Sequence, residues 1–219
     1  TGYTAPEESE YDVFKIGHTS TAAILATGAA KARDLKGEKD NIVAIIGDGS
    51  LSGGQAYEGL STGATLNSNF IVVVNDNNMS IAEVNGGLYK GLADLRKTNG
   101  KSDKNIFKAM GYDYYYLENG NSIDELIEIF KQVKDTPRPT VVHIHTIKGK
   151  GYEPAEKDPE KYQAIVDLRF QEFIDFFNDE AAVGTLTLKS KVYNYLKRSG
   201  LTDNELEQII QVLSTDIPR

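Results

Sequence analysis

The sequence contains no cysteine among its 219 residues, which excludes disulfides and metal sites built on thiolate ligands. It also lacks long apolar runs, since the two longest, residues 42–46 and 70–74, are far too short to span a bilayer. No basic segment followed by an apolar one opens the chain, so a signal peptide is not predicted. We therefore expect a soluble cytoplasmic protein. The chain starts at Thr1 rather than methionine, which is typical of a fragment or a processed product.

Positive charge is scarce as well. Lys and Arg number 24 against 32 Asp and Glu, which gives a net charge of −8 at pH 7. This balance argues against nucleic acid or an anionic membrane as the partner. The chain is nevertheless 40% hydrophobic, enough for a sizeable core, and its length suits one large α/β domain or two small ones.

Short apolar runs alternate with helical patterns along most of the chain. Residues 41–47 and 69–75 are rich in β-branched side chains, which is typical of strands buried on both faces of a parallel sheet. A helix over about 53–66 joins them in a right-handed crossover. Further patterns predict helices over about 19–35, 88–97, 105–110 and 122–134 and strands over 113–117 and 140–147, with Ser122 and Glu125 as a capping box. The sequence predicts an α/β fold with a doubly wound, mainly parallel sheet.

The character of the sequence changes after Gly151. Residues 153–163 are polar and contain prolines, as in a linker. Apolar residues then recur at helical spacing to the end of the chain. We therefore predict one domain over residues 1–163 and an all-helical appendage over 164–219, which either covers a sheet edge or dimerises.

The most informative motifs follow the first two predicted strands. Gly47-Asp48-Gly49-Ser50 ends one strand and Asn75-Asp-Asn77-Asn ends the next, and each alone is a common turn sequence. Together they are more specific, because ligands of open parallel sheets bind beyond the carboxyl ends of neighbouring strands. A carboxylate at Asp48 and an amide oxygen at Asn77 suit Mg²⁺, and glycines beside Asp48 allow a phosphate to approach the backbone. A bridging divalent ion would turn the repulsion between Asp48 and a diphosphate into attraction.

Three other candidates are weaker when taken alone. His143 and His145 are two apart on a predicted strand and face the same side, so they form either a metal pair or part of the sheet packing, and packing is the favoured interpretation. His18 lies in a turn rich in glycine and hydroxyl groups. The segment Lys148-Gly-Lys-Gly could grip a phosphate, but it lacks the Walker spacing.

Four sequence blocks follow one another along the chain. They are Gly17-His-Thr-Ser-Thr21, Gly47-Asp-Gly-Ser-Leu-Ser-Gly-Gly54, Asn75-Asp-Asn-Asn-Met-Ser-Ile81 and Lys148-Gly-Lys-Gly-Tyr-Glu-Pro-Ala-Glu156. Together and in this order they resemble 1-deoxy-D-xylulose-5-phosphate synthase, a family of transketolase-type enzymes that use thiamine diphosphate, and the resemblance runs from about Ser9 to Gln163. The resemblance implies the thiamine-diphosphate-binding fold and a transferase that makes 1-deoxyxylulose 5-phosphate and CO₂ from pyruvate and glyceraldehyde 3-phosphate.

The resemblance also implies roles for individual residues. Asp48, Asn77 and the backbone carbonyl of Met79 would hold Mg²⁺. The remaining cofactor contacts would come from Gly17, His18, Thr19, Gly47, Gly49, Ser50, Lys148 and Tyr152. Among these, His18 is also the catalytic candidate.

The chain departs from the family pattern in four respects. Nothing after Gln163 resembles the family's pyrimidine-binding domain, and about a hundred residues that precede Thr1 in the family are missing. Gln163 stands where the family has a histidine, and a glutamine cannot shuttle protons. The stretch from Gly87 to Asp113 is also shorter than in typical members. We therefore expect a homodimer, or a partner chain that supplies the pyrimidine-binding domain. The alternatives are one subunit of a split transketolase-like enzyme with another ketol donor, and a non-catalytic module that binds a cofactor or a partner.

Overall fold

The structure is a computed structural model of the chain, and it describes residues 4–10, 12–80, 84–160 and 202. The chain divides into two compact units, Thr1–Glu156 and Lys157–Arg219. The appendage predicted over residues 164–219 falls in the second unit and, apart from Thr202, lies outside the described residues. Its helices and the domain boundary at residue 163 therefore stay predictions.

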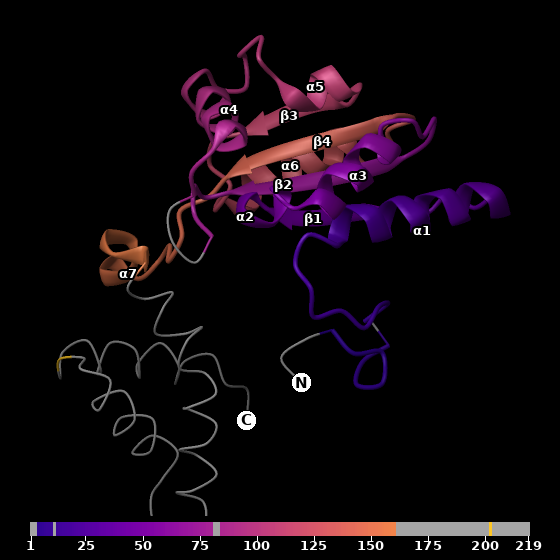
Figure 1. Ribbon diagram of the computed structural model, residues 1–219, viewed down its shortest axis with the longest axis horizontal. Coiled ribbons are helices and arrows are strands. Elements are labelled where there is room, and N and C mark those ends of the chain that lie inside the picture. Colours follow the sequence, from indigo (N-terminus) through magenta and orange to yellow (C-terminus); the bar gives the residue numbers. More distant parts are fainter. Residues whose placement is uncertain (1–3, 11, 81–83, 161–201, 203–219) are drawn as a thin grey trace, which may run out of the picture. The chain divides into compact units, whose positions relative to one another are not determined.

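Four parallel strands form the sheet of the first unit, in the order β1-β2-β4-β3 (Figure 1). They are β1 (Val43–Gly47), β2 (Phe70–Asp76), β3 (Asp113–Leu117) and β4 (Pro139–His145). The register pairs Gly47 with Asn75 and Asp76 with His145. The carboxyl ends of β1, β2 and β4 therefore lie side by side at one edge of the sheet.

Helices cover both faces of this sheet (Figure 1). The helices in the described residues are α1 (Ala22–Lys36), α2 (Asp48–Leu51), α3 (Gly54–Gly63), α4 (Gly87–Lys97), α5 (Ile106–Met110), α6 (Ile123–Val133) and α7 (Glu153–Lys157). One core cluster packs α1, α3, α4 and α5 against one face and includes the buried rings of Phe70 and Phe107. On the other face, α6 packs Ile129 and Val133 against β2 and β4. The predicted doubly wound α/β fold is confirmed.

The structure corrects the prediction that the first strand is buried on both faces. Val43 and Ile45 of β1 are 46% and 67% exposed, whereas their neighbours Ile71 and Val73 on β2 are 2% exposed. The reason is that β1 is an edge strand among the described strands, and the core on the α6 side is built from β2, β4 and their neighbours. A continuous apolar run therefore did not distinguish the edge strand from a central one.

Two local predictions also differ from the structure. The segment 153–163, predicted as a linker, begins with the short helix α7, whose first turn tolerates Pro154 because its missing N–H would have no partner in the helix. Ser122 does cap α6, with its Oγ accepting from the Glu125 N–H at 3.4 Å, but the capping box does not close. The Ser122 N–H donates to the Asn119 carbonyl, and the Glu125 carboxylate accepts from the Asn119 amide instead. Within the described residues, no helix is long and apolar enough to cross a membrane.

The contact between α1 and α3 depends on Gly59. A Cβ at this position would stand 2.4 Å from the Ile24 backbone nitrogen, and that backbone cannot move without shifting α1. We expect Gly59→Ala to lower the free energy of unfolding by about 1–3 kcal/mol, measured by urea denaturation. Gly91→Ala is the matched control, because a Cβ on α4 at that position meets nothing within 4 Å and should stabilise the helix by about 0.5–1 kcal/mol. Equal stabilities for the two variants would contradict this account of the packing.

Candidate functional site

The ends of β1 and β2 bring two polar segments together at the carboxyl edge of the sheet. Gly47 pairs with Asn75, so the turn that begins at Asp48 lies beside the loop 75–80. A Cβ at Gly49 would stand 2.8 Å from the Ser80 Cβ, which shows how closely the two segments approach. Only glycine at position 49 permits this approach without displacing the loop.

Asp48 is the most unusual residue at this edge. Its side chain is 2% exposed, and Oδ1 accepts a hydrogen bond from the Gly49 N–H at 3.0 Å. Oδ2 is buried and has no hydrogen-bond partner. Burial, followed by repulsion from the neighbouring carboxylate of Asp76, raises the pKa of Asp48 to about 6. A buried, unpartnered carboxylate oxygen of this kind is a donor atom that a cation would satisfy.

The loop after β2 supplies further oxygen atoms next to Asp48. The Asn77 Oδ1 accepts from the Met79 N–H at 3.1 Å, which folds the loop into a tight turn. Asn77 and Met79 are both half-buried. An amide oxygen has two lone pairs, so Asn77 can accept this bond and still face a cation. A carboxylate, an amide oxygen and backbone carbonyls are a donor set typical of Mg²⁺ or another hard divalent cation.

The turn that contains Gly17, His18 and Thr19 lies close to the segment after β1. A Cβ at Gly53 would stand 2.2 Å from the Ser20 Oγ, so this turn packs against the start of α3. The Nδ1 of His18 lies 2.8 Å from the Thr19 carbonyl oxygen and must donate to it, because a carbonyl only accepts. His18 is exposed, and its Nε2 is therefore the nitrogen available to a ligand.

Lys148 approaches the same edge from the loop after β4. Its Nζ donates to the Ser80 carbonyl at 2.5 Å, and Ser80 in turn lies against Gly49. Gly49, Ser80 and Lys148 are therefore contiguous, although 99 positions separate the first from the last in the sequence. Tyr152 lies in the turn before α7, where its N–H donates to the Gly149 carbonyl at 3.0 Å. The structure thus groups Asp48, Gly49, the loop 75–80 and Lys148.

A buried polar network supports the loop 75–80, and the sequence did not reveal it. Asp76 is fully buried, and its carboxylate accepts from Arg96, the Asn78 N–H and His143 Nε2. Burial alone would raise the pKa of Asp76, but the hydrogen bonds from His143 and Arg96 outweigh it and hold the pKa at about 2. The position of Asp76 inside the Asn-Asp-Asn-Asn segment was the one available signal, and it did not identify Arg96 or His143 as partners.

The packing interpretation of His143 is confirmed. The side chain is fully buried among the rings of Phe107, Tyr114 and Tyr116, and Nδ1 lies 2.8 Å from the Tyr114 hydroxyl. Across the part of the chain that the structure describes, no group of three or more His, Asp or Glu side chains is placed to hold a metal ion. The two histidines of β4 thus serve different neighbours, since His145 contacts Glu118 at 3.1 Å.

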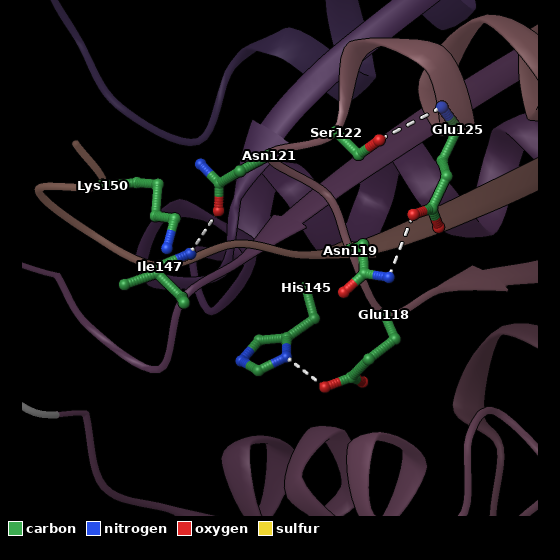
Figure 2. Close-up of a pocket in the computed structure, with 8 residues that line it drawn as sticks. All are labelled: Glu118, Asn119, Asn121, Ser122, Glu125, His145, Ile147 and Lys150. Carbon is green, nitrogen blue, oxygen red and sulfur yellow. Dashed lines mark hydrogen bonds and ion pairs between the residues drawn. The ribbon is translucent and has the colours of Figure 1, made fainter.

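His145 belongs to a separate hollow of about 350 Å³ on the β3 side of β4. Figure 2 shows the eight residues that line it, which come from the segment 118–125 and from the end of β4 onward. Several of their polar groups bond to one another: Glu118 with His145, Asn119 with Glu125, and Asn121 with the Ile147 N–H. None of these eight is among the predicted metal or cofactor ligands, although His145 is half of the possible metal pair and Lys150 lies in the segment that could grip a phosphate.

Comparison with known proteins identifies relatives of this chain. Residues 1–104 match the family model described as 1-deoxy-D-xylulose-5-phosphate synthase. The synthase of Porphyromonas gingivalis is 37% identical, over 72% of this chain and 31% of its own length. The synthase of Desulforudis audaxviator is 36% identical, over 75% of this chain and 32% of its own length. Among solved structures, the transketolase of Campylobacter jejuni superposes with a TM-score of 0.45 and 24% identity, over 63% of this chain and 22% of its own.

These matches cover only part of the relatives' length. The chain spans about a third of the length of the curated relatives that it matches. The match includes Asp48, Gly49, Asn77 and Met79, all within residues 1–104. Over this shared part, the chain is similar to the 1-deoxy-D-xylulose-5-phosphate synthases.

Proposed function

We propose that this chain is the diphosphate-binding part of a thiamine-diphosphate- and Mg²⁺-dependent transferase that makes 1-deoxyxylulose 5-phosphate and CO₂ from pyruvate and glyceraldehyde 3-phosphate. The single observation that carries the proposal is the buried, unpartnered Oδ2 of Asp48 beside the loop 75–80. Two carboxylates, Asp48 and Asp76, lie close enough for one to raise the pKa of the other. A divalent cation at this edge would satisfy Asp48 and draw in a diphosphate.

The residues present fit this cofactor. Asp48, Asn77 and the carbonyl of Met79 would hold the cation. Gly49, Ser50 and Lys148 would face the diphosphate. The other proposed contacts come from Gly17, His18, Thr19, Gly47 and Tyr152. When bound, thiamine diphosphate supplies carbanion chemistry for breaking and forming a bond next to a carbonyl carbon.

The side chains of this chain would bind, orient and balance charge around the cofactor. Lys148 would add a positive charge beside Ser80, which lies against Gly49. His18 would present Nε2, because its Nδ1 proton is engaged by the Thr19 carbonyl. In that position, Nε2 can accept or donate a proton at the cofactor or the substrate, which is the role of a general acid–base.

The proposal extends to partners. The pyrimidine-binding half of the site would come from another chain or another segment of a longer protein, and a homodimer is one way to supply it. This extension is supported by the fact that the chain corresponds to about a third of its relatives' length. The substrates would be small molecules, namely pyruvate and an aldose phosphate. The cytoplasmic location stays a prediction.

Calorimetry of the full chain tests the proposal directly. We expect thiamine diphosphate to bind in the presence of Mg²⁺ and to lose at least tenfold in affinity when a chelator removes the cation, because the uncompensated carboxylate of Asp48 then faces the diphosphate. Binding that does not depend on a divalent cation would contradict the proposed site. A second assay measures CO₂ release from pyruvate with and without the chain that carries the pyrimidine-binding domain. Binding without turnover in its presence would favour a non-catalytic module, to which Gln163 also points.

A further inference from the structure

We propose that Arg96 is a positioning residue for the loop 75–80, because its guanidinium fixes the two residues on either side of Asn77. This inference rests on the proposed function, in which the loop presents Asn77 and Met79 to the cation. Arg96 lies on α4, outside the four sequence blocks that mark the site.

The geometry of the guanidinium carries the inference. Its Nη1 donates to Asp76 at 2.6 Å for Oδ1 and 2.5 Å for Oδ2, and its Nη2 donates to the Asn78 Oδ1 at 3.0 Å. One rigid, planar group therefore bonds to both neighbours of Asn77. The Arg96 side chain is only 14% exposed and Asp76 is fully buried, so water competes little for the two bonds to Asp76, whereas Asn78 is exposed.

The bonds from Arg96 to Asp76 and Asn78 form a clamp around Asn77, and Asp76 is its fixed end. Its carboxylate also accepts from His143 Nε2 at 2.8 Å, and its backbone carbonyl accepts from the Thr146 N–H at 2.9 Å. His143 and Thr146 belong to β4 or follow it directly, so Asp76 is held to the sheet from one side and to α4 from the other. The position of the loop thus depends on two elements that lie far apart in the sequence.

Asn78 needs the clamp because of its backbone conformation. Its φ is +62°, a left-handed conformation that L-residues adopt at a cost and that asparagine tolerates better than most. The Asn78 N–H donates to Asp76 Oδ1 at 3.1 Å, while its side chain accepts from Arg96. These bonds close a ring through Asp76, Arg96 and Asn78, with Asn77 at its tip. Groups that orient the ligands of a metal in this way strongly affect metal affinity.

The test is Arg96→Lys in the full chain. Lysine keeps the positive charge but cannot bond to Asp76 and Asn78 at once with a planar fork. We expect the affinity for thiamine diphosphate with Mg²⁺, measured by calorimetry, to fall about 10- to 100-fold. Without any ligand, hydrogen exchange at the Asn78 and Met79 amides should become faster than in the unmodified chain, because both N–H groups bond to side chains within the clamped loop.

Arg33→Lys is the matched control. Arg33 is also a buried arginine, 4% exposed, and bonds to Asp34 and Ser68, but it lies on α1 and not in the loop. We expect it to lower the unfolding midpoint without changing ligand affinity or exchange at Asn78 and Met79. Unchanged exchange at those amides in Arg96→Lys, or equal changes in both variants, would overturn the inference. If the unmodified chain binds no thiamine diphosphate, the proposed function fails, whereas the exchange measurement still decides whether Arg96 holds the loop.

Discussion

Replacing Asp48 with asparagine should abolish the binding of thiamine diphosphate with Mg²⁺ and, at the same time, make the ligand-free chain more stable at neutral pH. The two effects have the same cause. Asp48 keeps a buried negative charge whose Oδ2 has no partner and which lies near the carboxylate of Asp76. Burying this charge destabilises the folded chain. A bound cation would offset the destabilisation, which is therefore present only in the ligand-free chain. Asparagine is almost the same size as aspartate but carries no charge. The substitution therefore removes both the destabilising buried charge and the carboxylate ligand of the metal.

The pH dependence of this gain follows from the pKa of Asp48. Burial raises this pKa from 3.8 to about 6, so the folded chain holds the Asp48 proton more tightly than the unfolded chain does. Folding stability therefore falls as the pH rises from about 4 to about 6, and the full cost is present above pH 6. A shift of this size corresponds to about 2–3 kcal/mol. Urea denaturation without divalent ions should show Asp48→Asn more stable by up to this amount at pH 7 and equal to the unmodified chain below pH 4.

The effect on ligand binding is measured separately from the effect on stability, and a control variant accompanies both. Ligand affinity is measured by calorimetry at pH 7, where a loss of at least a hundredfold is expected because the only carboxylate among the proposed metal ligands is gone. Asp113→Asn changes a carboxylate that is half exposed on β3, and it should alter neither ligand affinity nor stability appreciably. If Asp48→Asn binds the cofactor with Mg²⁺ as tightly as the unmodified chain, Asp48 is not a metal ligand.

Replacing Asp76 with alanine should cause a large loss of stability. Asp76 is fully buried and accepts from Arg96, His143 and the Asn78 N–H, so its removal leaves a guanidinium and an imidazole without their acceptor. Breaking a buried ion pair by removing one partner typically costs about 3–5 kcal/mol. We expect a loss of this size in the free energy of unfolding at pH 7, measured by urea denaturation. The matched control is Asp113→Ala, whose exposed contact with Arg138 at 3.7 Å should contribute about 0–1 kcal/mol.

Acid provides an independent check of the role of Asp76. Its pKa is held at about 2 in the folded chain, below the ordinary value of 3.8, so its contribution to stability is fully present above about pH 4. That contribution is lost as the pH falls from about 4 to about 2. The stability difference between the unmodified chain and Asp76→Ala should therefore narrow over this range. A difference that stays constant down to pH 2 would show that the loss comes from packing rather than from the charge network.

Local pattern was enough to predict most elements of the sheet domain. The strand 113–117 is found with its predicted bounds, and the other predicted strands and helices are found with ends shifted by one to three residues. Helix ends moved because the last turns depend on caps and neighbours, as at α3, which ends at Gly63 rather than near residue 66. The burial of β1 was predicted wrongly, because an apolar run records how hydrophobic a strand is and not which strands lie beside it.

The sequence by itself determined that Asp48 and Asn77 each follow a strand of one parallel crossover, because two apolar runs joined by one helix favour that unit and its right hand. That the two strands are direct neighbours was decided by the sheet order, since β2 and β3 are also consecutive in the chain and yet β4 separates them. Only the tertiary structure decided what surrounds them. Asp76 meets Arg96 and His143 across 20 and 67 positions, and Lys148 meets Ser80 across 68. Such contacts depend on how separate helices and strands pack, and a spacing along the chain does not specify which side chain will neutralise a buried charge.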